Sequence, residues 1–160
     1  MKELNVKIKM VCFDMDGTIA DLYGVKGWLD MLESHDPTPY MVANPMWNMA
    51  ELAEVLMALK ANGTEIRVIS WLSKSATAEY NGMVRQAKRE WLEEYGFVAD
   101  HIHLVKYGTT KADCVRKYLA EDETAILIDD NAKVREGWAL GGTIDPTACD
   151  LVEALRSLLP

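Results

Sequence analysis

The sequence predicts an α/β protein, a three-layer sandwich in which helices cover both faces of a central parallel sheet. Short apolar segments of strand length alternate with longer segments in which apolar residues recur at helical spacing, and this alternation is typical of parallel sheets. Residues 8–13 and 124–128 are apolar at nearly every position, as expected for strands that are buried on both faces.

The composition fits a single domain. A chain of 160 residues with 49% hydrophobic content can form one packed core but has little room for a second, so we expect one domain over residues 1–160. The formal net charge of −8 argues against a broad surface for nucleic acid, and we expect no stable nucleic-acid binding.

The cysteines and the apolar segments indicate a cytoplasmic protein that is not membrane-bound. Cys12, Cys114 and Cys149 are odd in number and far apart, which argues against a disulfide framework or a structural zinc site. Residues 1–10 lack the apolar core of a signal peptide, and no apolar run approaches the length of a membrane span.

The first strand is expected over Ile8 to Phe13 and runs directly into Asp14-Met15-Asp16-Gly17-Thr18, where Gly17 permits a sharp turn. Residues 20–46 contain several turn-forming residues and are expected to form a small insertion, a minimal cap within the domain. It would hold a short helix over 27–34 and a loop at 36–39, because residues before proline avoid the helical region.

The remaining elements follow in alternation. They are a helix through Leu52 to Leu59, a strand at 65–69 followed by Ser70 and Trp71, a helix from about 77 to 95, a strand at 101–105, a helix capped by Thr109 or Thr110 and running through Leu119, a strand at 124–128 followed by Asp129 and Asp130, a short helix through Trp138, an edge strand at 143–144, and a closing helix from Leu151 to Leu159.

Polar side chains follow four of these strands. Since ligands bind at the carboxyl ends of strands in open parallel sheets, we expect these side chains to meet at one edge. They are Asp14, Asp16, Ser70, Lys106 or Lys111, Asp129 and Asp130. Clustered carboxylates repel one another unless a cation joins them, and oxygen ligands suit Mg²⁺.

This set of groups predicts phosphate chemistry. Asp14 could attack phosphorus to form an aspartyl phosphate, while Ser70, neighbouring N–H groups and a lysine stabilise the developing charge. Asp16 would protonate the leaving group in the first half-reaction and activate water in the second.

These residues resemble the motifs of the haloacid dehalogenase (HAD) superfamily of phosphohydrolases over residues 11–131. Asp14-Met15-Asp16-Gly17-Thr18 matches the first motif residue for residue, and Ser70, Lys111 and the pair Asp129-Asp130 match the other three. The resemblance implies a Rossmann-like fold with the fourth strand beside the first. It also implies a Mg²⁺-dependent phosphatase that acts on phosphorylated small molecules.

The resemblance also implies residue roles. The expected Mg²⁺ ligands are Asp14, the backbone carbonyl of Asp16, Asp130 and, directly or through another group, Asp129. The expected phosphate-binding residues are Ser70, Trp71, Lys111, Gly17 and Thr18. The residues from Asp14 to Asp21 further resemble the 5′(3′)-deoxyribonucleotidase branch, and Val105 to Asp113 resemble small bacterial and phage phosphatases near it, so nucleotides are candidate substrates.

Several alternatives stay open. Lys106 could take the place of Lys111, and the substrate could be the end phosphate of an oligonucleotide or another macromolecule. A receiver-like signalling domain shares the acidic Mg²⁺ pocket, although its paired acids would follow the first strand. A catalytically silent relative that binds a phosphorylated ligand is the remaining possibility.

Other residues have a functional and a plain interpretation. Trp28, Trp47 and Trp71 could form an aromatic wall for a nucleobase, although tryptophans more often pack in a core. His101 and His103 alternate on one strand face, but no third soft ligand accompanies them. The trio of Arg85, Lys88 and Arg89 is expected to be a solvated helix face.

Overall fold

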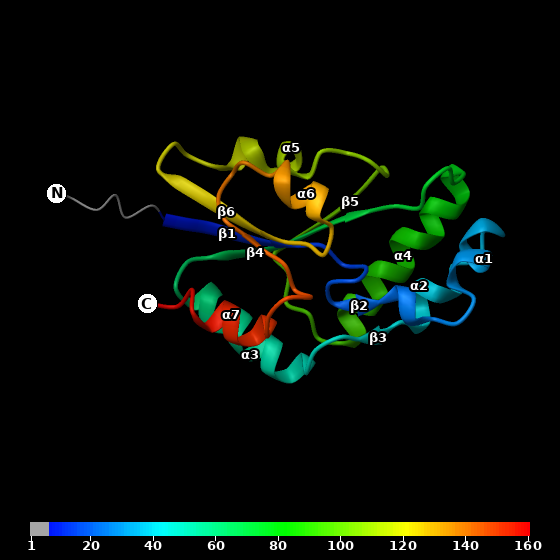
Figure 1. The fold of residues 1–160 in the computed structure, drawn as a ribbon, viewed down its shortest axis with the longest axis horizontal. Helices are drawn as coiled ribbons and strands as arrows, with labels where there is room; N and C mark the ends of the chain where they lie inside the picture. Colours follow the sequence, from blue (N-terminus) through cyan, green and yellow to red (C-terminus); the bar gives the residue numbers. More distant parts are fainter. Residues whose placement is uncertain (1–6) are drawn as a thin grey trace.

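The computed structural model describes residues 7–160 and contains one parallel sheet with helices on both faces, as predicted (Figure 1). The strand order is β5-β4-β1-β6-β7, so the strand that precedes Asp129 pairs directly with the strand that precedes Asp14. The strands are β1 (Lys7–Phe13), β4 (Glu65–Trp71), β5 (His101–Val105), β6 (Glu123–Ile128) and β7 (Thr143–Ile144). Residues 1–6, part of the segment in which we expected no signal peptide, lie outside the described residues.

Helices form the two outer layers. Figure 1 shows α5 and α6 on one face of the sheet and α3 and α7 on the other, which α4 also covers. These helices are α3 (Met49–Ala61), α4 (Ala78–Glu94), α5 (Lys111–Val115), α6 (Ala132–Glu136) and α7 (Leu151–Arg156). Among the described residues no helix combines the length and apolar character that a membrane span needs.

The alternation of side chains along β1 explains why both faces are covered. Val11 and Phe13 pack into the core beneath α3, α4 and α7, while Met10 and Cys12 pack into the core beneath α5 and α6. All four side chains are fully buried. The carboxyl end of β1 is therefore held rigidly, and the loop after it starts from a fixed position.

Residues 20–45 form a small folded insertion at the carboxyl end of the sheet. Two short antiparallel strands, β2 (Ala20–Asp21) and β3 (Asn44–Pro45), close its base, and η1 (Leu22–Gly24), α1 (Trp28–Glu33) and α2 (Thr38–Val42) lie between them. The side chains of Leu22 and Tyr40 are buried in a third apolar cluster against α4. The insertion is thus anchored to α4 by this shared cluster.

Some predicted element boundaries were wrong. The expected loop at 36–39 instead contains the start of α2, because a proline is tolerated in the first helical turn, where the N–H group has no helical partner in any case. The helix after β5 is also shorter than expected: α5 ends at Val115, and a 3₁₀ turn, η2 (Arg116–Tyr118), replaces its second half. The closing helix α7 ends at Arg156.

Candidate functional site

The loop after β1 places Asp14 and Asp16 at the carboxyl end of the sheet. Gly17 has φ +77°, and a Cβ atom there would lie 2.5 Å from Oδ2 of Asp130. Only glycine combines this left-handed conformation with so close an approach. The glycine therefore brings the first acidic pair against the loop that follows β6.

Lys111 joins the loops after β1 and β6. Its Nζ donates to Asp14 Oδ1 at 2.9 Å and to Asp129 Oδ2 at 2.7 Å, and its side chain is 3% exposed. Burial opposes the charge of Lys111, but the two carboxylates outweigh it and raise the pKa of the ammonium group. Lys106, the alternative lysine, is exposed. The structure therefore places Lys111, and not Lys106, beside the acids.

Three carboxylates form a cluster that could hold a cation. Oxygens of Asp14, Asp129 and Asp130 lie within 4.8 Å of one another. Burial, followed by Asp14, raises the pKa of Asp129, and burial together with Asp14 raises the pKa of Asp130 to about 8. The cluster thus resists full ionisation by itself, and a hard divalent cation would relieve the repulsion.

Side chains around this cluster orient its members. Thr18 Oγ1 donates to Asp14 Oδ2 at 3.0 Å and lies 3.4 Å from Asp130 Oδ1. Asp129 accepts from Lys111 and from the Asn131 N–H. Since both oxygens of Asp129 have partners, Asp130 has more capacity to bind a cation directly.

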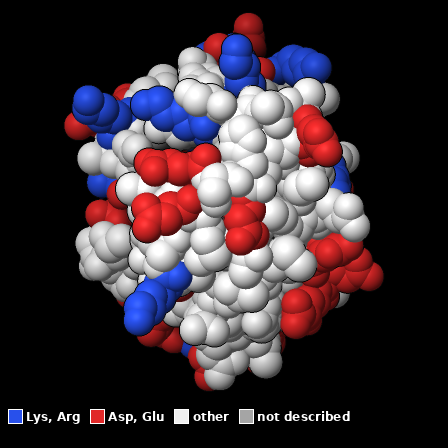
Figure 2. Space-filling model, turned by 90° about the vertical axis from the view of Figure 1, so that its right-hand side faces the viewer, with Lys and Arg blue, Asp and Glu red and all other residues white. Residues whose placement is uncertain are grey.

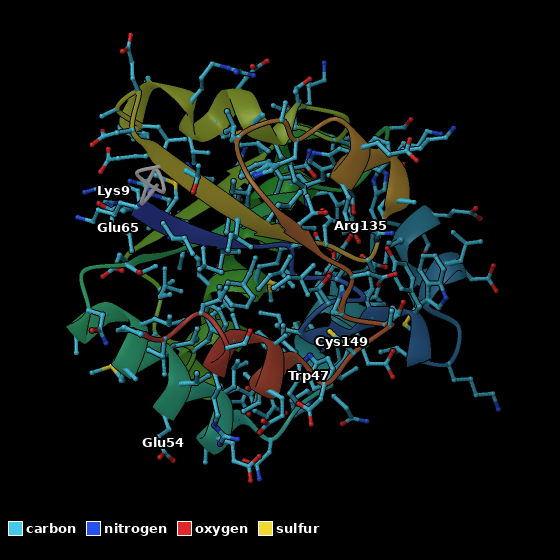
Figure 3. The ribbon with its side chains drawn as sticks, turned by 60° about the vertical axis from the view of Figure 1, so that its left-hand side comes forward. Lys9, Trp47, Glu54, Glu65, Arg135 and Cys149 are labelled. Atoms are coloured by element: carbon cyan, nitrogen blue, oxygen red, sulfur yellow. The ribbon has the colours of Figure 1, made fainter. Side chains whose placement is uncertain are left out.

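Arg135 fixes the loop after β6 from α6. Its Nη1 donates to the backbone carbonyl of Asp129 at 3.0 Å, and its Nη2 lies 3.5 Å from Asp145. Figure 3 shows Arg135 beside this end of the sheet, whereas the ion pair of Lys9 and Glu65 lies at the opposite end. The acidic loop is thus supported from outside the cluster.

Asp16 and Ser70 share a partner that the sequence analysis missed. Lys88 Nζ donates to Asp16 Oδ2 at 2.9 Å and to Ser70 Oγ at 2.7 Å. Lys88 was expected on a solvated face, and this was wrong for Lys88 although Arg85 and Arg89 are exposed. A signal was present, because Val84, Lys88 and Trp91 recur at the spacing of one buried helix face.

The environment of Asp16 suits a proton donor. Its carboxyl group is largely buried, and burial raises its pKa even though Lys88 acts in the opposite direction. Its side chain faces Lys88 and is not part of the three-acid cluster. Asp14 and Asp16, two residues apart, therefore contact different lysines and lie in different surroundings.

The other predicted phosphate-binding groups have the following partners. The Gly17 N–H donates to the Ala20 carbonyl and the Thr18 N–H to the Met15 carbonyl, so both amides stabilise the loop itself. The Trp71 side chain donates from Nε1 to the Thr109 carbonyl at 2.8 Å. It thereby ties the end of β4 to the segment that precedes Lys111.

A cavity of about 310 Å³ opens above these acids. Asp14, Asp16, Lys111, Asp129 and Asp130 lie at its polar end. Its walls come from the insertion, from the end of β4 and the loop after it, from the loop after β5, and from Asn131 and Val134 after β6. The aromatic lining residues are Tyr23, Trp28, Tyr40, Trp71 and Tyr107.

Two of the three tryptophans considered for an aromatic wall line this cavity. Trp28 and Trp71 do so, whereas Trp47 packs against the core and donates from Nε1 to the Thr18 carbonyl at 2.7 Å. Figure 3 shows Trp47 near α3 and α7. His103 is also engaged elsewhere, because its Nε2 lies 3.0 Å from Arg67 Nη1, and an arginine can only donate.

No protein-family model matches the sequence, and no curated protein matches it significantly. Solved structures do resemble the fold. A D,D-heptose 1,7-bisphosphate phosphatase from B. bronchiseptica, complexed with magnesium and phosphate, aligns with a TM-score of 0.53 at 14% identity, covering 96% of this chain and 89% of that one.

A second structure, from Mesorhizobium loti and described as a HAD-like phosphatase, aligns with a TM-score of 0.50 at 16% identity, covering 96% of this chain and 88% of that one. Both alignments run over nearly the whole chain, including the sheet and its two helical layers. The protein described here therefore has the fold of the HAD-like phosphatases.

Proposed function

We propose that the protein is a Mg²⁺-dependent phosphomonoester hydrolase that acts through an aspartyl phosphate. The observation that carries this proposal is the position of Asp14. Its carboxylate belongs to the three-acid cluster, contacts Lys111, and lies in a cavity of about 310 Å³. The fold shared with HAD-like phosphatases supports the same chemistry.

The acids and Lys111 divide the work in this proposal. Asp14, Asp130 and the Asp16 backbone carbonyl would hold Mg²⁺, with Asp129 positioned by Lys111 beside them. When bound, the ion neutralises the carboxylates and the phosphate so that they can approach each other. Lys111 balances the charge on Asp14 and on the transferred phosphoryl group.

Covalent catalysis then proceeds through side chains of this chain. An oxygen of Asp14 attacks phosphorus, and the ester oxygen leaves with a proton from Asp16. The Ser70 hydroxyl and the Trp71 backbone N–H, at the end of β4, contact the phosphoryl oxygens. Asp16 next takes a proton from water, which attacks the aspartyl phosphate, releases phosphate and restores Asp14.

We further propose that nucleoside monophosphates are the substrates. Five aromatic side chains line the cavity, and a nucleobase stacks well on such rings. The volume is at the lower end of the range for small-molecule sites. Residues 20–46 act as a minimal cap, since Tyr23, Trp28 and Tyr40 come from this segment.

The surface charge favours a small substrate over an oligonucleotide. On the face drawn in Figure 2, acidic side chains are spread over the surface and basic side chains lie mainly along its upper edge. A groove that follows a nucleic-acid backbone would need a continuous basic track. The net charge of −8 agrees with this interpretation.

The test is a panel of phosphate-release assays. It covers deoxyribonucleoside and ribonucleoside 5′- and 3′-monophosphates, sugar phosphates and end-phosphorylated oligonucleotides, with Mg²⁺ and with EDTA. Asp14→Asn should lower kcat/KM by at least about 10³-fold, while Asp122→Asn, an exposed control, should match the wild type. Activity that survives Asp14→Asn would refute the covalent mechanism, and no activity on any substrate would favour a binding role.

The substrate class has a separate test. Trp28→Ala should raise KM for nucleoside monophosphates by about 5- to 150-fold, because stacking on one aromatic side chain contributes about 1–3 kcal/mol. The KM for glycerol phosphate, which has no ring, should stay the same. Faster hydrolysis of sugar phosphates than of nucleotides would contradict the nucleotide assignment.

A further inference from the structure

Lys88 is the only fully buried lysine among the described residues, and all its donors are used. It lies in α4 with its side chain 0% exposed. Besides Asp16 Oδ2 and Ser70 Oγ, its Nζ donates to the backbone carbonyl of Trp71 at 2.8 Å. Tyr40 covers it, with Nζ 5.1 Å from the ring centroid. One ammonium group thus joins the loop after β1, the end of β4 and the insertion.

The chemistry of an ammonium group fixes the direction of these hydrogen bonds. Lysine only donates, so both Asp16 Oδ2 and Ser70 Oγ must accept from Lys88. The Ser70 O–H is consequently directed away from Lys88, toward another acceptor. Asp16 is likewise held through Oδ2, which leaves Oδ1 as the oxygen that can exchange a proton with a ligand.

The packing of α4 gives no structural need for a charge here. The neighbours of Lys88 on the same helix face, Val84, Ala87 and Trp91, are apolar and buried. A buried ion pair is weak evidence for stability, because an apolar residue of similar volume often stabilises a fold as well or better. A lysine whose donors reach two groups of the candidate active site is better explained by the chemistry of that site.

We propose that Lys88 is a positioning residue for the phosphatase reaction, one that aligns Asp16 to protonate the leaving group and directs the Ser70 hydroxyl toward the phosphate. This inference rests on the proposed function. Its distinguishing consequence concerns the leaving group. Departure of a basic alkoxide requires a well-placed proton donor, whereas departure of an acidic phenolate hardly does.

The experiment compares two esters of nearly the same shape, p-nitrophenyl phosphate and p-nitrobenzyl phosphate. The first releases an acidic phenol and the second a basic alcohol. We expect Lys88→Met to lower kcat/KM by about 10²- to 10³-fold for the benzyl ester but by only about 10-fold for the phenyl ester. The control Arg85→Met removes the same charge from an exposed position of α4 and should leave both values unchanged.

Folding of the variants is addressed in two ways. All rates are normalised to the folded fraction measured by circular dichroism, and Lys88→Gln, which keeps two amide donors, should fall between wild type and Lys88→Met. In addition, Lys88→Met is combined with Asp16→Asn, which replaces the ion pair by a neutral pair. In the Asp16→Asn background, Lys88→Met should not further change the ratio of the kcat/KM values for the two esters.

Two results would overturn the inference. One is an equal loss of kcat/KM for both esters in Lys88→Met. The other is that Lys88→Met changes the ratio of the two kcat/KM values as much in the Asp16→Asn background as in the wild type. Both results can be obtained only if the wild type is active, so they leave the proposed function intact. If the wild type hydrolyses neither ester with Mg²⁺, the proposed function itself fails, and this inference fails with it.

Discussion

Replacing Asp130 by asparagine should stabilise the metal-free protein while it abolishes activity. Burial and the neighbouring Asp14 raise the pKa of Asp130 from its ordinary value of 3.8 to about 8. The unfolded chain therefore releases this proton near pH 4 and the folded chain only near pH 8, so the wild type loses stability as the pH rises through this window. Asparagine keeps the shape but carries no charge.

The magnitude follows from the shift. About four pH units at about 1.36 kcal/mol each give an upper limit of about 6 kcal/mol. Asp130 is only partly buried, and solvent screening reduces this to about 1–3 kcal/mol. For a chain of this size the unfolding midpoint at pH 8 should rise by about 2–12 °C, and the difference should vanish near pH 4.

Thermal unfolding in EDTA between pH 4 and pH 8 measures this effect, with Asp122→Asn as the control for a lost surface charge. Repeating the series with Mg²⁺ tests the role of Asp130 as a ligand. Mg²⁺ at 100 times its Kd should stabilise the wild type by about 2.7 kcal/mol and the variant much less. An Asp130→Asn protein that is less stable than the wild type at pH 8, or equally stabilised by Mg²⁺, would refute the reasoning.

Two further predictions test the site loop and the core. Gly17→Ala should cost more stability than the about 1 kcal/mol of its control Gly63→Ala and should abolish Mg²⁺-dependent phosphate release. Both glycines have positive φ, but only at Gly17 would the new Cβ clash, with Asp130 and Tyr23; equal losses in thermal unfolding would show that these side chains move aside. Burial raises the pKa of Cys12 from 9.0 to about 12, so the unfolded chain ionises first and the wild type should lose about 1.4 kcal/mol at pH 10. Urea unfolding should show the stability of the wild type falling by this amount relative to Cys12→Ala between pH 8 and pH 10. A difference in stability that does not change with pH would contradict the raised pKa of Cys12.

The strands along the chain and the positions of the strand-end acids could be predicted from the sequence. Apolar segments such as Ile8 to Phe13 are recognisable because a strand buried on both faces has few polar positions to interrupt it. The acids directly after β1 and β6 are then placed at one edge by the rules of parallel sheets. The resemblance to the HAD motifs supplied the pairing of these two strands, which the structure confirms.

The insertion was harder to predict because its signals are local and compete. Proline before or within a segment usually argues against a helix, yet Pro39 lies in the first turn of α2, where it does no harm. Tyr40 is buried in the cluster that forms where α2 packs against α4. Burial of this kind depends on a partner that is distant in the chain, so no local pattern contains it.

The contact between Lys88 and Asp16 depends on the tertiary structure, whereas the position of Asp16 after a buried strand depends on the local sequence. The sequence by itself determined that Asp14 and Asp16 follow a buried strand, because hydrophobic periodicity and turn chemistry act over a few residues. Only the tertiary structure decided that a lysine 72 positions away from Asp16 would donate to it. The physical reason is that a buried charge is stable only where specific distant partners converge on it, and such convergence is a property of the folded chain.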